Sequence, residues 1–248
     1  MNDYPVFKNP PIVEAILDIQ VLLPSDTSLA TLASVQEPVK ERYPDSQERE
    51  YWQINATDFG NGSPNISQSG GVVGYMFLPS APVQDRAFQS LMSNFTFSKL
   101  PPYTNWGAFR AEAEELWDVY GEITGPIEIK RLGLRTINRL NLPLPFGDLK
   151  EYILTVPEVA TGIASGLAQF AMSIAIPQPH GELAVVTLAM QPLQPNTSFV
   201  TIIFDIDVSF ESNIAPNSDA IWQRFESLRR IRNDIFLCSL TDKAKGLF

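Results

Sequence analysis

Residues 127–142 read IEIKRLGLRTINRLNL, and this stretch decides the fold that the rest of the sequence predicts. Successive side chains of a β-strand point to opposite faces of the sheet. As a strand, the stretch places its three arginines on one face together with Ile129, and its leucines on the other face with two polar residues, Thr136 and Asn138. Prolines at positions 126 and 143 bracket it. We therefore predict a long strand that opens the second half of the chain.

The arginines of this strand, Arg131, Arg135 and Arg139, recur every four residues, which is about 13 Å at roughly 3.3 Å per residue. A planar guanidinium fork suits phosphate or carboxylate groups. The row is therefore the candidate site for binding an anion or a partner. The sequence offers no other candidate binding residues, and no catalytic, cofactor-binding or metal-binding residue is expected.

Internal pairing is the favoured alternative for the arginine row. The chain has 18 basic and 28 acidic residues, so acidic neighbours are abundant. Glu14 and Asp18 have the same four-residue spacing on the strand that opens the first half, and Asp205 and Asp207 lie on the last strand. If the two opening strands lie side by side, Glu14 and Asp18 are expected to face the arginines.

Composition restricts the class of function. A net charge of −10 argues against nucleic acid as a partner, because it repels phosphate backbones. One cysteine and one histidine exclude an internal disulfide and leave few arrangements for a metal or a nucleophile. The N-terminus lacks the pattern of a secretion signal, and no apolar run is long enough for a membrane span. We expect a cytoplasmic protein without a cofactor or a membrane partner.

Three isolated residue patterns contain residue types that occur in functional sites, but a structural role is favoured for each. Asp205 and Asp207 could bind a hard cation, but two carboxylates on one strand supply too few ligands. His180 lies in IPQPHGEL, which is typical of a hairpin turn. Cys238 follows Phe236 on a predicted helix and is expected to behave as a small hydrophobic residue. Each is expected to be structural.

The first half of the chain predicts a strand, a helix, three strands and a helix. The strands are expected at residues 10–24, 51–59, 71–78 and 88–100, and a flexible hairpin loop, rich in Gly, Asn and Ser, at residues 58–71. A helix capped within residues 25–28 should be interrupted at Pro38. A second helix should start after Thr104 or Asn105 and stop at Gly121 and Gly125.

The second half repeats this order. After the arginine strand, Asp148 should start a short helix, followed by strands at residues 168–176, 182–191 and 199–211 and a helix that opens at Ser218 or Asp219. Trp-x-x-Phe occurs at corresponding points, residues 106–109 and 222–225, where core packing is expected.

We therefore predict an α+β fold with a mainly antiparallel sheet and helices on one face, built from two pseudo-equivalent β-α-β-β-β-α halves, residues 1–125 and 126–248, packed as one unit. The architecture is analogous to the saddle of the TATA-binding protein, without implying its function.

Several motifs together resemble a sporadically distributed prokaryotic family of about 250 residues that is uncharacterised. They are PPIVEAILDI at residues 10–19, FTFSKLPPYTNWGAF at 95–109, ELWDVY at 115–120, RLGLRTINRL at 131–140 and F-x-x-x-L-T-D-K at 236–243. The resemblance covers the chain from end to end. It implies a context among mobile or defence-associated genes and assigns no activity, cofactor or site residue.

Catalytic residue types are scarce, whereas a large sheet surface is a natural binding platform. The leading functional hypothesis is a non-enzymatic protein that binds another protein, such as a chaperone-like or immunity-like component of a defence or toxin system, with a homo-oligomer possible. The alternative is a small-anion sensor or an enzyme that uses Arg131, Arg135 and Arg139.

Overall fold

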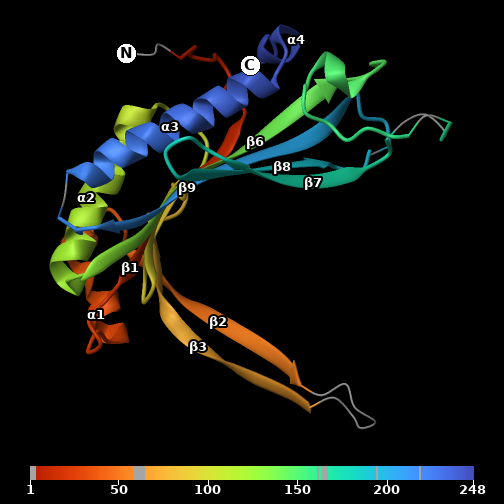
Figure 1. Cartoon of the computed structure of the whole chain (residues 1–248). Helices are drawn as coiled ribbons and strands as arrows, with labels where there is room; N and C mark the ends of the chain where they lie inside the picture. The colour runs from red at the N-terminus through yellow and green to blue at the C-terminus, as the bar shows by residue number, and fades with distance from the viewer. Residues whose placement is uncertain (1–3, 58–64, 161, 164–166, 194, 218) are drawn as a thin grey trace.

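The computed structural model describes residues 4–57, 65–160, 162–163, 167–193, 195–217 and 219–248, without the side chains of residues 54–57, 65–68 and 212. Within these residues, nine strands form one antiparallel sheet in the order β2-β3-β4-β5-β1-β6-β9-β8-β7 (Figure 1). The strands are β1 (Ile12–Leu22), β2 (Asp45–Thr57), β3 (Asn65–Leu78), β4 (Arg86–Leu91), β5 (Asn94–Lys99), β6 (Glu128–Pro143), β7 (Phe170–Pro177), β8 (Glu182–Met190) and β9 (Phe199–Ile214). The predicted α+β class with a mainly antiparallel sheet is confirmed.

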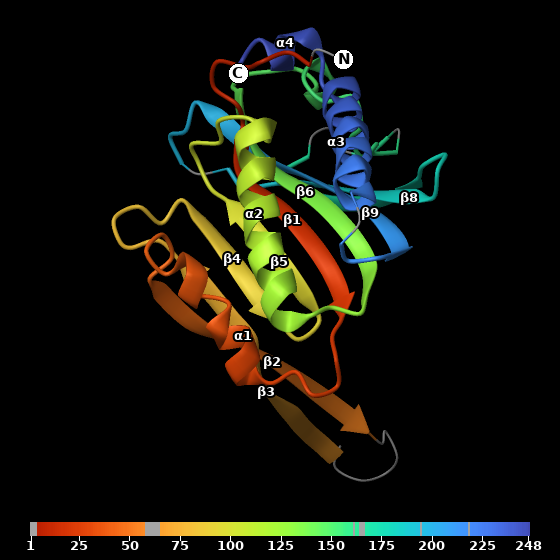
Figure 2. The same cartoon turned by 90° about the vertical axis from the view of Figure 1, so that its left-hand side faces the viewer.

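Helices cover one face of this sheet, and α2 and α3 lie across its centre (Figure 2). The helices are α1 (Leu29–Ser34), η1 (Glu37–Val39), α2 (Trp106–Thr124), η2 (Leu149–Glu151), α3 (Ala220–Ser239) and α4 (Asp242–Lys245), where η denotes a 3-10 helix. Asn105 caps α2 by accepting a hydrogen bond from the Ala108 N–H. Helix α2 continues through Gly121, where the sequence predicts a stop, and ends at Gly125, whose φ of 56° is the left-handed conformation that glycine tolerates.

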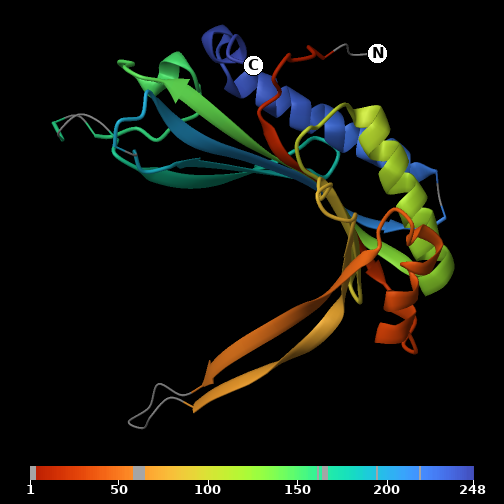
Figure 3. The ribbon, with the colours of Figure 1, turned by 180° about the vertical axis from the view of Figure 1, so that it is seen from behind.

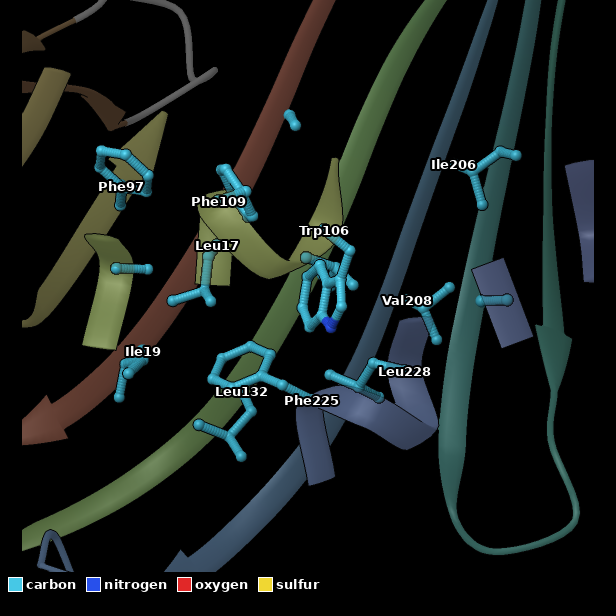
Figure 4. Packing of buried hydrophobic residues seen from close by; sticks show 14 of the residues in the cluster. Leu17, Ile19, Phe97, Trp106, Phe109, Leu132, Ile206, Val208, Phe225 and Leu228 are labelled. Carbon is cyan, nitrogen blue, oxygen red and sulfur yellow. The ribbon is translucent and has the colours of Figure 1, made fainter. Parts of the chain in front are cut away.

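The hydrophobic core lies between the sheet and these helices. Alternate residues of β1, including Leu17 and Ile19, are fully buried, as are Leu132 and Leu134 of β6. Figure 4 shows Phe109 of α2 and Phe225 of α3 over these strands. The prediction that the two Trp-x-x-Phe pairs pack in the core is confirmed, because all four of their aromatic side chains are buried.

The opening strands β1 and β6 are neighbours at the centre of the sheet, as expected, and they pair antiparallel. Their register is irregular between the pairs Gln20/Arg131 and Val21/Ile129. This β-bulge changes which face the flanking side chains point to. Ile129 is therefore fully buried on the helix side, and its predicted place on the arginine face is wrong.

Residues 88–100 do not form the single strand that the sequence predicts. They make a tight hairpin of β4 and β5, in which Phe88 and Phe97 are direct cross-strand partners and both are fully buried. The first half therefore contains strand, helix, four strands and helix, so the predicted β-α-β-β-β-α order is wrong there. The reason is that a two-residue turn, Met92-Ser93, divides a stretch whose apolar and polar residues otherwise alternate as in one strand.

Strands β2 and β3 are longer than predicted and form a ribbon that leaves the body of the molecule (Figure 1). Residues 50–57 pair with residues 65–72, beyond the short segment of β3 that pairs with β4. We call these residues the arm. Residues 65–71, predicted as loop, belong to strand β3, whereas residues 58–64 of that predicted loop lie outside the described residues. Strand pairing thus continues through residues 65–71, although their Gly, Asn and Ser content is typical of a turn.

Candidate binding surface

No helix of the described residues covers the sheet face opposite α2 and α3, and we call this the open face (Figure 1). The sheet curves so that this face is concave, with β7 and β8 along one side and the arm along the other (Figures 1 and 3). Its centre is formed by β1, β6 and β9, which place the arginines of β6 between acidic residues of its two neighbours. The predicted arginine row therefore lies at the middle of the open face.

Arg131 spans the three central strands. Its Nη1 lies 3.5 Å from Oδ2 of Asp18 on β1, and its Nη2 lies 3.2 Å from Oδ2 of Asp207 on β9. Gly133 makes this geometry possible, because a Cβ atom at that position would lie 2.7 Å from Nη1 of Arg131. Gly133 is the register partner of Asp18, so the guanidinium lies over a bare backbone and reaches both carboxylates. The expected pairing of Asp18 with Arg131 is confirmed.

The other two arginines are held differently. Arg135 donates from Nε and Nη2 to the two carboxylate oxygens of Asp205, at 2.8 and 2.5 Å, and these bonds raise the pKa of Arg135. Glu14 forms no ion pair within the described part of the chain, so the expected direct pairing of Glu14 with Arg135 is wrong. The charge of Glu14 is near enough only to add to the effect of Asp205 and Asp207 on the pKa of Arg135. Strand register does not distinguish the two carboxylates, because Glu14 on β1 and Asp205 on β9 are both partners of Ile137. The guanidinium of Arg135 is turned toward β9, where it forms both hydrogen bonds with Asp205.

Arg139 completes the row and is exposed. It makes no side-chain ion pair with any residue that the structure describes. Its backbone N–H donates to the Pro11 carbonyl at 2.8 Å, and its strand partner on β9 is Ile203. The structure therefore brings two of the three predicted site residues into internal ion pairs and leaves the third facing solvent. No surface with three free arginines exists on this face.

Asp18 sits in a network that was not predicted. Its Oδ1 accepts hydrogen bonds from Thr96 Oγ1 at 2.8 Å and from Asn94 Nδ2 at 2.9 Å, both on β5. Burial nevertheless raises the pKa of Asp18 above its ordinary value of 3.8, and these hydrogen bonds and Arg131 only partly oppose that effect. The raised pKa of Asp18, at the centre of the open face, favours the protonated form of its carboxyl group.

This raised pKa predicts a pH dependence of stability. The folded protein binds the Asp18 proton more tightly than the unfolded chain does, so the stabilisation by this group is complete below pH 3.8 and is lost as the pH rises through the folded pKa. The free energy of unfolding of Asp18→Asn, relative to wild type, should therefore increase with pH across that window. Urea titrations at several pH values measure this difference, with the exposed Asp26→Asn as control. A difference that decreases with pH contradicts the assignment.

The arm exposes two adjacent aromatic residues of β2. Tyr51 is 61% and Trp52 is 53% exposed. The Trp52 indole donates from Nε1 to Oε2 of Glu50 at 2.8 Å, and its ring packs so closely on Gly70 that a Cβ there would lie 2.8 Å from Cε3. Because neighbouring residues of a strand point to opposite faces, Tyr51 and Trp52 present an aromatic ring on each face of the arm.

The structural interpretations of the isolated residues were only partly right. His180 lies in an exposed turn between β7 and β8, as predicted. Cys238, expected to pack as a small hydrophobic residue, is exposed on α3. Among the residues described, no group of three or more His, Cys, Asp or Glu side chains is arranged to hold a metal ion. Over the same residues, no helix is both long and apolar enough to cross a membrane.

Sequence reasoning missed a buried arginine on the helix side of the sheet. Arg232 of α3 is only 6% exposed and lies with Thr136 and Asn138 of β6 around one cavity. The signal was present in the sequence, because Arg232 falls on the apolar stripe of α3 formed by Phe225, Leu228 and Phe236. A charged residue on a buried stripe indicates a specific polar environment.

Comparisons with known proteins identify no family, so the interpretation rests on the geometry described above. The sequence matches neither a protein-family model nor a curated protein.

Proposed function

We propose that this chain is a non-enzymatic protein that holds another protein against its open face and arm. The observation that carries the proposal is the arm itself, a two-stranded ribbon that extends from the sheet with aromatic side chains exposed on both faces. An isolated two-stranded ribbon is at best marginally stable in water. Tyrosine and tryptophan are the residues most enriched at the energetic centres of protein interfaces. A bound partner would supply the packing that the arm lacks.

The outer edge of β2 adds a mode of binding. Strand β2 ends the sheet, so one side of its backbone has no neighbouring strand within the described residues. Near the body of the molecule this edge carries charges, at Glu48, Arg49 and Glu50, which discourage strand pairing. Further out, residues 51–57 read YWQINAT and carry none. An uncharged edge strand favours the addition of a strand from a partner.

The alternative proposal, a small-anion sensor or enzyme built on the arginine row, is favoured less by the geometry. Arg135 is saturated by a bidentate pair with Asp205, and Arg131 lies between two carboxylates. An incoming anion would have to displace these partners. Arg139 alone is free to meet a ligand, and a single exposed cation is better suited to a contact within a protein interface than to a small-molecule site.

We further propose that the chain arose from two related halves, residues 1–125 and 126–248. The sheet order supports this, since β5, β4 and β3 follow β1 outward in the same way as β9, β8 and β7 follow β6. A long helix, α2 or α3, follows the last strand of each half. The similarity to the TATA-binding protein saddle is proposed at this level of architecture alone. Strand β2 has no counterpart in the second half, which makes the arm the part added for binding.

The resemblance to a sporadically distributed prokaryotic family suggests the biological setting. Genes with such a distribution often accompany mobile elements or defence clusters. We propose that the partner is a protein of such a system, with this chain in a chaperone-like or immunity-like role. Neither role requires this chain to be an enzyme.

A double substitution in the arm tests the function. Tyr51→Ser with Trp52→Ser should reduce the yield of a stoichiometric partner, co-purified at native expression level, by at least tenfold, because it removes both exposed rings. The thermal midpoint of the protein body should change little, since both rings are more than half exposed and lie outside the hydrophobic core. The matched control is Leu154→Ser, which changes a side chain that is 55% exposed away from the arm. Retention of the partner by the double variant contradicts the proposal.

A further inference from the structure

A cavity of about 230 Å³ lies on the helix side of the sheet, opposite the open face. Its walls come from the N-terminal segment, the start of α2, the middle of β6 and the second half of α3. Phe7, Pro11, Trp106 and Phe236 make much of its surface apolar. For comparison, an engineered cavity of about 150 Å³ is large enough to bind benzene. The cavity can therefore hold a small molecule with one ring or a short chain.

Arg232 contributes a positive charge to this apolar cavity. Its Nε and Nη2 donate to Oδ1 of Asn233, at 3.2 and 2.6 Å, and its Nη1 is buried without a hydrogen-bond partner in the described residues. No carboxylate of those residues forms an ion pair with it. Burial lowers the pKa of Arg232, and the nearby charge of Arg229 acts in the same direction. A buried guanidinium normally has an anionic partner, because removing its charge from water is costly.

Further unsatisfied donors surround the same space. Nε of Arg229 is buried and has no hydrogen-bond partner among the described residues. The buried Tyr103 hydroxyl faces Arg232 and interacts with its guanidinium, but it carries no negative charge that would balance the arginine. Arg229 has one carboxylate neighbour, Glu226 at 3.4 Å, which also accepts from Trp106 Nε1 and from Arg110. Asn105 and Trp106 place the N-terminal end of α2, with its partial positive charge, at the cavity wall.

The polar residues of β6 fit this picture. Thr136 and Asn138 interrupt the apolar face of the strand, and both are almost fully buried at the cavity. Asn138 donates from Nδ2 to the Phe204 carbonyl at 2.9 Å, which fixes the orientation of its amide. Hydrophobic walls with a few fixed polar groups are the usual construction of a small-molecule site.

We propose that this cavity binds a small monocarboxylate with an apolar body, whose carboxylate meets Arg232 and Tyr103. A carboxylate would supply the acceptor that the buried donors of Arg229 and Arg232 lack, and the apolar walls favour a ligand with an apolar body over a small inorganic anion. This site lies on the other side of the sheet from the proposed partner surface and does not depend on it. Ligand occupancy would stabilise the junction of the N-terminal segment with α2 and α3.

Titration calorimetry with hexanoate, benzoate and phenylacetate tests the proposal. At least one should bind the wild-type protein at least tenfold more tightly than its uncharged amide, because the amide leaves Arg232 without a counter-charge. Inorganic phosphate is titrated as well, to measure whether an anion without an apolar body binds. If none of the three carboxylates binds, or if only phosphate binds, the proposal is wrong.

Two variants locate the binding. Arg232→Met should weaken the affinity for the carboxylate at least tenfold. It should also raise the thermal midpoint of the ligand-free protein, because it removes an unpaired buried charge. Tyr103→Phe removes only a hydroxyl and should weaken binding without loss of the fold. Arg230→Gln, two residues away on the exposed side of α3, is the matched control and should leave affinity unchanged. Binding that survives both Arg232→Met and Tyr103→Phe overturns the assignment to this cavity.

Discussion

Replacing Arg131 with glutamine is expected to lower the free energy of unfolding by about 3 kcal/mol, as for a buried ion pair broken by loss of one partner. Its guanidinium lies between Asp18 and Asp207, and removing it leaves two carboxylates facing each other at the centre of the sheet. The Arg131 side chain is 21% exposed, so solvent screens these charges only partly. Denaturant midpoints for wild type and variant measure the loss.

Arg135→Gln is the matched control on the same strand. Its side chain is 44% exposed, so the loss of its pair with Asp205 should cost less than about 1 kcal/mol. The double variant Asp18→Asn with Arg131→Gln should lose less than the sum of the single losses, because the two residues share an interaction. Equal small losses at both arginines, with strict additivity, would mean that the row is free and available to an anion.

Substituting Gly74 with alanine is expected to destabilise the protein by at least about 2 kcal/mol, the cost of forcing a side chain into a disfavoured backbone conformation with a close contact. Gly74 has φ of 150°, and a Cβ there would lie 2.2 Å from the Ser90 carbonyl oxygen. This glycine stands at the end of the β3 segment that pairs with β4, where the arm departs. Thermal or denaturant unfolding measures the effect, and partner capture should fall with it.

Gly71→Ala is the control three residues further along the arm. A Cβ at Gly71 has no heavy atom within 4 Å, and its φ lies outside the positive range. The substitution should be neutral, or stabilising by up to about 1 kcal/mol through the entropy of the unfolded chain. If Gly71→Ala destabilises as much as Gly74→Ala, the departure of the arm does not depend on the conformation of Gly74.

The periodicity of the sequence predicted most of the sheet, because alternation over β1 and β6 reports directly which side chains face a core. It placed Asp18 and Arg131 on the same face and their strands side by side, both of which the structure confirms. Pairing partners were harder to predict. Glu14 and Asp205 are both register partners of Ile137, on opposite sides of β6, so strand pairing alone does not decide which carboxylate meets Arg135. The side-chain conformation of Arg135 decides it, and that conformation leaves no signal in the sequence pattern.

The errors have local physical causes. A bulge beside Arg131 moves Ile129 to the other face, and bulges leave little signal in an alternating pattern. The glycine content of residues 65–71 predicts a loop, yet Trp52 packs on Gly70 across the ribbon and the strand continues through the glycines. The apolar periodicity along α3 predicts that position 232 is buried, but periodicity alone does not indicate what surrounds a charged side chain there.

Hydroxyl-radical footprinting of the purified native complex tests the central claim most directly, namely that the arm and the open face bind a partner protein. Tyr51 and Trp52 are exposed in the chain alone and should be oxidised readily. In the complex, both should be protected at least fivefold, while labelling of Cys238, exposed on α3, stays the same. Unchanged oxidation of Tyr51 and Trp52, with protection confined to Cys238 and the helix side, would contradict the account.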